Sequence, residues 1–203
     1  MTREQAIEII LDCIKPNDIV VATTGKTGRE LFELREKRHE SHQQDFLNIG
    51  AMGHASMVAL GMALAKPRRA VWCLDGDGAL LMHMGALAII GSHCQTLSVR
   101  HLVLNNGAHD SVGGQPTAGF FVDMPELARA SGYRYAARAA TKAEIAKEIN
   151  QLARARGPAF LEIRVACGAR ADLGRPMRSL TYLKNNFISF IRKGKKRKKG
   201  RQS

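Results

Sequence analysis

Short apolar runs alternate along the chain with longer segments in which apolar residues recur at helical spacing. Ile19–Ala22 is one such run: four apolar residues between Pro16 and a polar, glycine-bearing segment, as expected of a strand buried on both faces. Similar runs follow at intervals that leave room for a helix in between. The predicted strands cover residues 19–22, 70–74, 99–104, 133–138 and 160–165.

Capping signals mark where several helices begin. Thr2 with Gln5, and Thr141 with Glu144, have the capping-box spacing, in which two side chains satisfy the first backbone N–H groups. Helices are predicted before Pro16, through 31–35, over 53–65 and 80–90, from Asp123 to Gly132, and from Thr141 to 157. Residues 23–28, 37–45 and 75–78 are predicted to be a polar loop, a charged surface loop and a turn.

Strands that alternate with helices predict an α/β fold: a mostly parallel sheet with helices on both faces. The length of 203 residues, with 45% apolar residues and 19 glycines, suits one large domain, which we predict over residues 1–190. In such sheets ligands bind beyond the carboxyl ends of the strands. Residues 75–78 (DGDG) and 105–107 (NNG) follow two predicted strands, so we expect them to lie side by side.

The net charge of +13 comes mostly from the end of the chain. Residues 192–201 read RKGKKRKKGR, with eight cations and no acid, and the 191 residues before them carry only +5. Such a run suggests a nucleic-acid-binding protein as the non-enzyme alternative, since Lys and Arg contact phosphates without reading sequence. It has no interleaved aromatic residue for stacking on bases. We therefore interpret residues 191–203 as a disordered, solubilising tail and expect no nucleic-acid partner.

Several classes of protein are excluded. No run of about 18 uncharged apolar residues exists, so we expect no membrane span and no membrane partner. The N-terminus carries Glu4 and Glu8 and lacks the apolar core of a signal peptide. The four cysteines, at positions 13, 73, 94 and 167, have no CxxC spacing, which argues against a zinc site or a disulfide framework. We therefore expect a cytoplasmic protein.

The segment around Asp77 carries the candidate chemistry. Asp77 lies between two glycines, where the backbone can approach a ligand closely. Its carboxylate and the amide oxygen of Asn106 suit Mg²⁺ or Ca²⁺, and the amides of Gly78 and Ala79, before a helix, favour phosphate. A diphosphate bound through a divalent cation would use both the metal-binding oxygens and the phosphate-binding amides. GDG alone is a common strand-to-helix turn. The 26 residues that separate it from the sequence NN favour a functional interpretation of this motif.

With this spacing the sequence resembles the thiamine diphosphate enzymes, whose diphosphate-binding domain carries GDG, a gap of this size and NN. Residues 48–55 (NIGAMGHA) resemble the segment that holds the cofactor's pyrimidine. Residues 105–117 (NNGAHDSVGGQPT), 23–31 (TTGKTGREL) and 171–176 (ADLGRP) are similar to the phosphonopyruvate decarboxylase branch, with the sulfopyruvate decarboxylases close by. The resemblance covers roughly residues 1–190.

The resemblance implies roles for individual residues. Asp77, the Asn106 side chain and the Ala108 carbonyl would ligate Mg²⁺, with diphosphate oxygens and water completing an octahedron. The amides of Gly78 and Ala79 would bind the diphosphate, and Ala79 stands where the family often has Ser or another small residue. The other residues placed at the cofactor are Thr24, Gly25, Lys26, Gly50, Ala51, Met52 and Gly76.

Two of these residues would shape the cofactor. The Gly50 carbonyl would accept a hydrogen bond from the 4′-amino group, and Met52 would lie under the thiazolium ring; an ordinary core methionine is the alternative for Met52. His54 and His109 are candidate catalytic residues at the rim of the site, with plain surface positions as the alternative. Asn105 is interpreted either as part of the site or as a turn residue without a ligand.

Other polar residues have two possible uses. Lys26 and Arg29 either hold a phosphonate-bearing substrate or lie in a solvated loop. Gln115 and Thr117 either hydrogen-bond the substrate or hold their own loop in place.

By the same resemblance the chain takes part in the decarboxylation of a small anionic 2-keto acid, with the thiazolium ring of thiamine diphosphate accepting the electrons that CO₂ loss releases. Phosphonopyruvate, which gives phosphonoacetaldehyde, is the first candidate. Sulfopyruvate or another 2-keto acid is the alternative.

The family also needs a glutamate on the cofactor's pyrimidine ring, carried by a separate pyrimidine-binding domain. This chain has room for one of the two domains, and we interpret its Glu30, Glu33, Glu36 and Glu40 as solvated charges. We therefore expect a β-type subunit, or the C-terminal half of a longer enzyme, that works with a pyrimidine-binding α-type partner in a homo- or hetero-oligomer. The initial Met1 favours a natural subunit.

Overall fold

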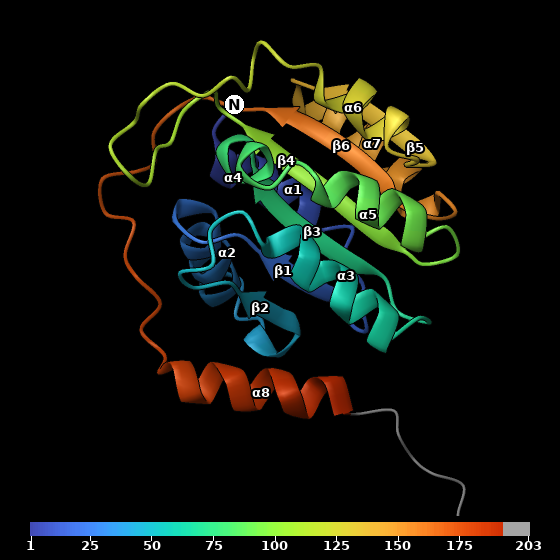
Figure 1. Cartoon of the computed structure of the whole chain (residues 1–203). Helices are drawn as coiled ribbons and strands as arrows, with labels where there is room; N and C mark the ends of the chain where they lie inside the picture. Colours follow the sequence, from blue (N-terminus) through green and yellow to red (C-terminus); the bar gives the residue numbers. More distant parts are fainter. Residues whose placement is uncertain (193–203) are drawn as a thin grey trace, which may run out of the picture.

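Six parallel strands form one sheet in the computed structural model, which describes residues 1–192 (Figure 1). The strand order is β2-β1-β3-β4-β6-β5, and every neighbouring pair is parallel. The predicted α/β class with a parallel sheet is therefore confirmed. The strands are β1 (Ile19–Ala22), β2 (Asp45–Leu47), β3 (Val71–Gly76), β4 (Val99–Asn105), β5 (Tyr135–Ala139) and β6 (Ala159–Arg164).

Helices cover both faces of this sheet. They are α1 (Arg3–Leu11), α2 (Lys26–Lys37), α3 (Ala55–Ala65), α4 (Asp77–Met82), α5 (Ala86–His93), α6 (Met124–Ala130), α7 (Lys142–Arg154) and α8 (Leu180–Arg192), with a 3₁₀ helix η1 (His42–Gln44). Val20 and Leu74 pack with α1, α2 and α7, whereas Val21 and Cys73 pack with α3, α5 and α6. All four residues of β1 are buried, which explains its continuous apolar run.

The helix starts predicted from capping signals are confirmed. The hydroxyls of Thr2 and Thr141 each accept a hydrogen bond of 3.2 Å from the backbone N–H three residues later. The side chains of Gln5 and Glu144 accept from the capping residue's N–H in return, which completes both capping boxes. Asp123 caps α6 through its own carboxylate. These local signals therefore set where three helices begin.

The turn predicted over residues 75–78 is wrong, because β3 runs directly into α4. Gly76 keeps extended backbone, with φ −118° and ψ 158°, and Asp77 opens the helix. The carboxylate therefore stands at a strand-to-helix junction. Two helix boundaries also differ from the prediction: a turn at residues 83–85 divides the predicted helix 80–90 between α4 and α5, and α2 begins at Lys26.

Residues 37–45, predicted to be a charged surface loop, contain η1 and the first residue of the edge strand β2. His42 and Asp45 of this segment are buried, whereas Lys37 and His39 are exposed as predicted. Arg35 donates two hydrogen bonds to Asp45, of 3.0 and 3.1 Å. The His42 ring stacks on Phe32 with 4.2 Å between centroids. A three-residue strand that begins with a carboxylate has no apolar pattern to reveal it, so tertiary pairing decides its conformation.

Helix α8, which the sequence pattern did not predict, lies beside β2 (Figure 1). Phe187 and Phe190 are its buried residues. Phe187 meets the Phe46 ring edge to face at 5.5 Å, and the Arg69 guanidinium lies 4.0 Å from the centre of the Phe190 ring. The helix therefore covers the free edge of the sheet through side-chain packing, which shields that edge from another chain.

The predicted domain boundary at residue 190 falls inside α8, which continues to Arg192. The first two residues assigned to a disordered tail are therefore helical. The rest of that tail, residues 193–203, lies outside the described residues. Within the described part of the chain, no helix combines the length and the apolar character needed to cross a membrane.

The carboxyl ends of β1, β3 and β4 meet at one edge of the sheet. Gly76 of β3 pairs with Leu104 of β4, so Asp77 and Asn106 follow neighbouring strand ends. The predicted side-by-side placement of these two segments is confirmed. The chain leaving β6 passes this edge on its way to α8 (Figure 1).

Candidate functional site

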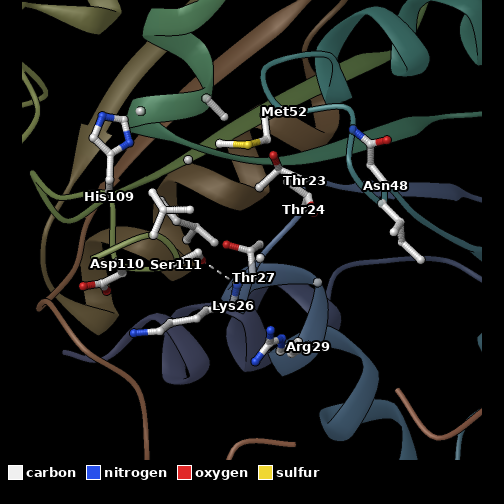
Figure 2. A pocket seen from close by; sticks show the side chains of 18 of the residues that line it. Thr23, Thr24, Lys26, Thr27, Arg29, Asn48, Met52, His109, Asp110 and Ser111 are labelled. Atoms are coloured by element: carbon white, nitrogen blue, oxygen red, sulfur yellow. Dashed lines mark hydrogen bonds between the residues drawn. The ribbon is translucent and has the colours of Figure 1, made fainter. Parts of the chain in front are cut away.

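A cavity of about 570 Å³ opens at the carboxyl ends of β1, β3 and β4 (Figure 2). The predicted site residues converge on it, although more than eighty positions separate the first from the last. All of them except Ala51 and His54 line the cavity. The lining members are Thr24, Gly25, Lys26, Gly50, Met52, Gly76, Asp77, Gly78, Ala79, Asn106, Ala108 and His109.

Asp77 is a buried carboxylate that no cation neutralises within residues 1–192. The residue is 2% exposed. Burial raises the pKa of this carboxyl, against the Thr117 hydroxyl and the nearby backbone amides of Asn106 and Gly78, which lower it. An ionised carboxylate in such surroundings is stabilised by a cation. The buried carboxylate of Asp77 is therefore suited to bind a divalent metal ion.

Asn106 and Ala108 add neutral oxygens next to Asp77. The Asn106 side chain donates from Nδ2 to Asp110 Oδ2 at 2.6 Å and accepts at Oδ1 from the Ala108 N–H at 3.1 Å. The Ala108 carbonyl accepts no hydrogen bond from any described residue. Carboxylate, amide and carbonyl oxygens make the kind of ligand set that Mg²⁺ prefers. The predicted metal ligands are therefore neighbours of compatible chemistry.

The His109 ring occupies the space beside Gly78. A Cβ atom at Gly78 would lie 2.5 Å from two atoms of that ring. The His109 N–H donates to the Gln115 carbonyl at 2.8 Å, and the His109 carbonyl accepts from Gly114 at 3.0 Å. The loop thus closes on itself through Gln115 and holds the ring at the cavity wall, next to the start of α4.

Thr117 and Asn105 connect the site to the sheet beneath it. The Thr117 hydroxyl donates to Asp77 and accepts from the Gly119 N–H at 3.0 Å. Asn105 is fully buried and donates to the Gly119 carbonyl at 2.7 Å and to Glu162 at 2.8 Å. Neither side chain lines the cavity. Thr117 was considered either as a substrate contact or as a residue that holds its own loop. In the structure its hydroxyl makes contacts within the protein, to Asp77 and Gly119.

The segment from Asn48 to Gly53 forms a tight turn at the cavity rim, with φ values of +81° at Gly50 and +76° at Gly53. Asn48 donates to the Ala51 carbonyl at 2.7 Å, and the Met52 N–H donates to the Gly50 carbonyl at 3.0 Å. That carbonyl keeps a second lone pair for another donor. Met52 is 43% exposed at the cavity, so it is not an ordinary core methionine.

His54 lies behind this turn rather than in the cavity wall. It stands at the N-cap position of α3, where its side chain makes no capping hydrogen bond. Its ring meets the His83 ring edge to face at 4.6 Å. The structure therefore pairs His54 with a second histidine from the junction of α4 and α5.

The start of α2 brings a backbone constraint and cations to the cavity. Gly25 has φ +100°, and a Cβ atom there would collide with Ser111. The Ser111 hydroxyl accepts from the Lys26 N–H at 3.0 Å (Figure 2). Lys26, Arg29 and Arg175 line the cavity, and none of them forms an ion pair with a carboxylate of residues 1–192. Such side chains are available to an anionic ligand.

Arg3, also at the cavity wall, is the centre of a buried ionic network. Its guanidinium donates to Glu30 at 2.6 and 3.0 Å, to Asp110 at 3.3 Å and to the Gly168 carbonyl at 3.2 Å. Glu30 is 2% exposed, so its interpretation as a solvated charge is wrong. Burial raises the pKa of the Glu30 carboxyl, although Arg3 acts to lower it. The network ties α1 and α2 to the loop after β4.

Arg3, Asp110 and Ser111 are among the cavity residues to which the sequence analysis gave no individual role. Asp110 and Ser111 lie inside the motif over residues 105–117, so their position was a signal that could have been used. Arg3 offers no such signal, because only folding brings the first helix to the site.

A second polar cluster lies in the core. Cys73, Asp75 and His101 are buried with their ligand atoms within 4.8 Å of one another. Both His101 nitrogens already have partners, Asp75 at 3.3 Å and the Tyr133 hydroxyl at 3.1 Å. Burial raises the pKa of the Cys73 thiol well above its ordinary value, which disfavours the thiolate that binds metals. We interpret the cluster as a hydrogen-bonded network, in which Asp75 also accepts from the Gly76 N–H at 3.0 Å.

Comparisons with known proteins agree with this geometry. Residues 23–163 match the sequence model described as thiamine pyrophosphate enzyme, C-terminal TPP binding domain. The chain is 38% identical over 190 residues to the phosphonopyruvate decarboxylase of Streptomyces viridochromogenes, covering 94% of this chain and 46% of the relative. It is 31% identical over 132 residues to the sulfopyruvate decarboxylase subunit beta of Methanococcus maripaludis, covering 65% and 67%.

The solved structures agree in fold. A thiamine diphosphate-dependent 4-hydroxybenzoylformate decarboxylase of Rhodococcus jostii superposes with a TM-score of 0.68 at 21% identity, covering 83% of this chain and 33% of that chain. The chain thus spans about a third of that structure. It spans less than half of the phosphonopyruvate decarboxylases of Streptomyces viridochromogenes and Streptomyces hygroscopicus, 46% and 42%.

Proposed function

Because the chain belongs to the thiamine pyrophosphate enzymes, through their C-terminal TPP-binding domain, we propose that it binds thiamine diphosphate through Mg²⁺ as part of a 2-keto acid decarboxylase. The family predicted from the sequence motifs is confirmed. The observation that carries the proposal is Asp77, a buried carboxylate that has no cationic partner among residues 1–192 and lies beside the side-chain oxygen of Asn106 and the Ala108 carbonyl.

Three residues would hold the metal in this proposal: Asp77, Asn106 and Ala108. Gly78 and Ala79, in the first turn of α4, would present backbone amides to the diphosphate. When bound, thiamine diphosphate supplies the electron sink for the carbon–carbon bond that breaks as CO₂ leaves a 2-keto acid.

The remaining cavity residues would act on the ligands directly. Met52 provides an exposed apolar wall, and the Gly50 carbonyl has a lone pair free for an amino group. His109 would exchange a proton with the reacting part of the substrate, because its ring stands beside the start of α4. His54 would support the rim through its contact with His83.

We propose phosphonopyruvate as the substrate, with phosphonoacetaldehyde and CO₂ as products. Two relatives named phosphonopyruvate decarboxylase are 38% and 41% identical to this chain, against 31% for a sulfopyruvate decarboxylase subunit beta. Lys26, Arg29 and Arg175 favour a substrate with a strongly anionic tail, since they line the cavity without ion-pair partners among residues 1–192. A phosphonate can carry two negative charges where a sulfonate carries one.

A partner chain is the second half of the proposal. Among residues 1–192, no glutamate lines the cavity, so the glutamate that this family uses on the pyrimidine ring would come from a pyrimidine-binding domain elsewhere. The relative from Methanococcus maripaludis is named a beta subunit, and this chain covers 67% of it. Exposed apolar side chains at the rim, Ile49 at 58% and Met52 at 43%, suit contact with another domain.

Calorimetric titration of the full chain with thiamine diphosphate tests the cofactor part. We expect binding that depends on Mg²⁺ and that Asp77→Ala abolishes, because the variant loses the only charged metal ligand. Asp12→Ala removes an exposed carboxylate far from the cavity and should bind as the unaltered chain does. If neither the chain alone nor the chain with a pyrimidine-domain partner binds the cofactor, the proposal is wrong.

Reconstitution tests the partner and the substrate. We expect little decarboxylation by the chain alone and a large gain on adding a pyrimidine-domain chain. Full activity without a partner would contradict the two-chain arrangement. A panel of phosphonopyruvate, sulfopyruvate and pyruvate on the complex would then rank the acids, and a preference for sulfopyruvate would replace the proposed substrate.

A further inference from the structure

We propose that Asp110 is a positioning residue of the metal site. By accepting a hydrogen bond from the side-chain NH₂ group of Asn106, it keeps the amide oxygen of Asn106 as the atom that ligates the metal. This inference rests on the proposed function, since it concerns the same Mg²⁺ and diphosphate site. In this role Asp110 contacts the metal ligand Asn106 and does not itself bind the metal.

Two contacts select the same orientation of the Asn106 amide. Nδ2 lies 2.6 Å from Asp110 Oδ2, and Oδ1 lies 3.1 Å from the Ala108 nitrogen. In the reversed orientation, the amide oxygen would face a carboxylate and the NH₂ group would face an N–H. Both contacts would then be repulsive, because a carboxylate has no proton to donate and an N–H cannot accept.

Asp110 is itself held in place. Its Oδ2 accepts from the Gly168 N–H at 2.9 Å and from the Arg3 guanidinium at 3.3 Å, in addition to Asn106. Its side chain is 11% exposed. Arg3 in turn is fixed by two hydrogen bonds to Glu30. The acceptor that selects the amide orientation therefore belongs to a buried network that reaches α1 and α2.

The orientation matters because only one end of an amide can bind a cation. A rotated Asn106 would present an NH₂ group to Mg²⁺ and remove a ligand without any change in the backbone. Groups that orient a metal ligand in this way typically change metal affinity or activity by about 10–100-fold when they are removed.

Asp110→Asn is the sharpest single substitution. It preserves the size of the side chain and can still accept from Arg3, but it can also donate to Asn106 and so satisfy the reversed amide. With thiamine diphosphate at saturation, we expect the affinity for Mg²⁺, measured by calorimetry, to fall by about 10–100-fold. Glu30→Gln is the matched control, because it removes one negative charge from the same network without touching Asn106. An equal loss in both variants would show that charge alone is responsible and would overturn the inference.

A double substitution separates positioning from simple damage. Asn106→Asp with Asp110→Asn exchanges the two side chains and conserves charge. A carboxylate at position 106 offers an oxygen in either orientation, so it no longer needs to be oriented. We expect this variant to recover the Mg²⁺ affinity that Asp110→Asn loses. Failure to recover it, in a chain that folds, would overturn the inference.

The outcomes distinguish this inference from the proposed function. If the unaltered complex binds no Mg²⁺ with thiamine diphosphate, the proposed function fails; if it binds and Asp110→Asn binds equally well, only the positioning role fails. Should Asp110→Asn not fold, the unaltered chain still answers the question. The side-chain amide protons of Asn106, assigned through Asn106→Asp in NMR spectra, should exchange slowly with solvent. Fast exchange would overturn the inference.

Discussion

Gly78 is a residue at which one added methyl group should disturb the site. A Cβ atom there would lie 2.5 Å from two ring atoms of His109, whereas a Cβ at Gly76 would meet nothing within 4 Å. We therefore expect Gly78→Ala to displace the His109 ring toward the cavity and to reduce the free energy of unfolding by about 1 kcal/mol, the lower end of overpacking. Gly76→Ala should change it by less than about 0.5 kcal/mol. Urea unfolding of the two ligand-free variants is the measurement, and equal losses would contradict the packing seen here.

At the same scale, all of the residues predicted for the site line the cavity except Ala51 and His54. Asp77 and Asn106 stand in motifs whose order and spacing carry the resemblance, and parallel strands place such motifs at one edge. The hydrogen bond between Asp110 and Asn106 could not be predicted in this way. The two residues lie four positions apart in a loop, and a loop can adopt many conformations. Arg3 is harder still, since its contact with Glu30 depends on how two helices dock.

Helix α5 closely approaches the end of α6 at Gly91. A Cβ atom at Gly91 would collide with the backbone carbonyl of Ser131, while a Cβ at Gly61 of α3 would meet nothing within 4 Å. We expect Gly91→Ala to destabilise the protein by about 3 kcal/mol. Gly61→Ala should stabilise it by about 0.5–1 kcal/mol, because it removes the entropic penalty of a helical glycine.

Denaturant unfolding of these two helix variants, with the slope of the transition compared, checks the prediction. The slopes should stay similar, because both substitutions leave the unfolded chain nearly the same. Stabilisation by Gly91→Ala would show that α5 and α6 do not approach as described.

Local sequence determines where some helices begin, whereas other elements form only through tertiary contacts. Thr2 and Thr141 allow the starts of their helices to be predicted, because a capping box involves only four consecutive residues. The three-residue strand β2 and helix α8 escaped prediction for a different reason. Their conformation depends on contacts such as that between Phe46 and Phe187, which join segments more than a hundred residues apart. No periodic pattern records a partner at that distance.

For the whole molecule, the distribution of charge separates the cofactor site from the basic end of the chain. Without residues 192–201, which hold eight cations, the net charge falls from +13 to +5. Several arginines of the remainder are used internally, including Arg3, Arg35 and Arg138, which pair with buried carboxylates. These pairs reduce the charge that the body offers to a polyanion, although other cations of the body, such as Lys66, Arg68 and Arg156, are in no ion pair with a carboxylate of residues 1–192.

Deletion of residues 193–203, which removes seven cations while leaving α8 whole, should separate two kinds of anion binding. We expect the affinity for thiamine diphosphate with Mg²⁺ to be unchanged, because Asp77 and Asn106 would hold the diphosphate through the metal. Any affinity of the full chain for duplex DNA should fall steeply with salt, since each neutralised phosphate releases counterions, and this salt dependence should vanish with the deletion. A variant of full length with the seven cations replaced by glutamine controls for length. Salt-dependent DNA binding that survives in both variants would place the polyanion site on the body, where Lys26, Arg29 and Arg175 are the unpaired cations of the cavity.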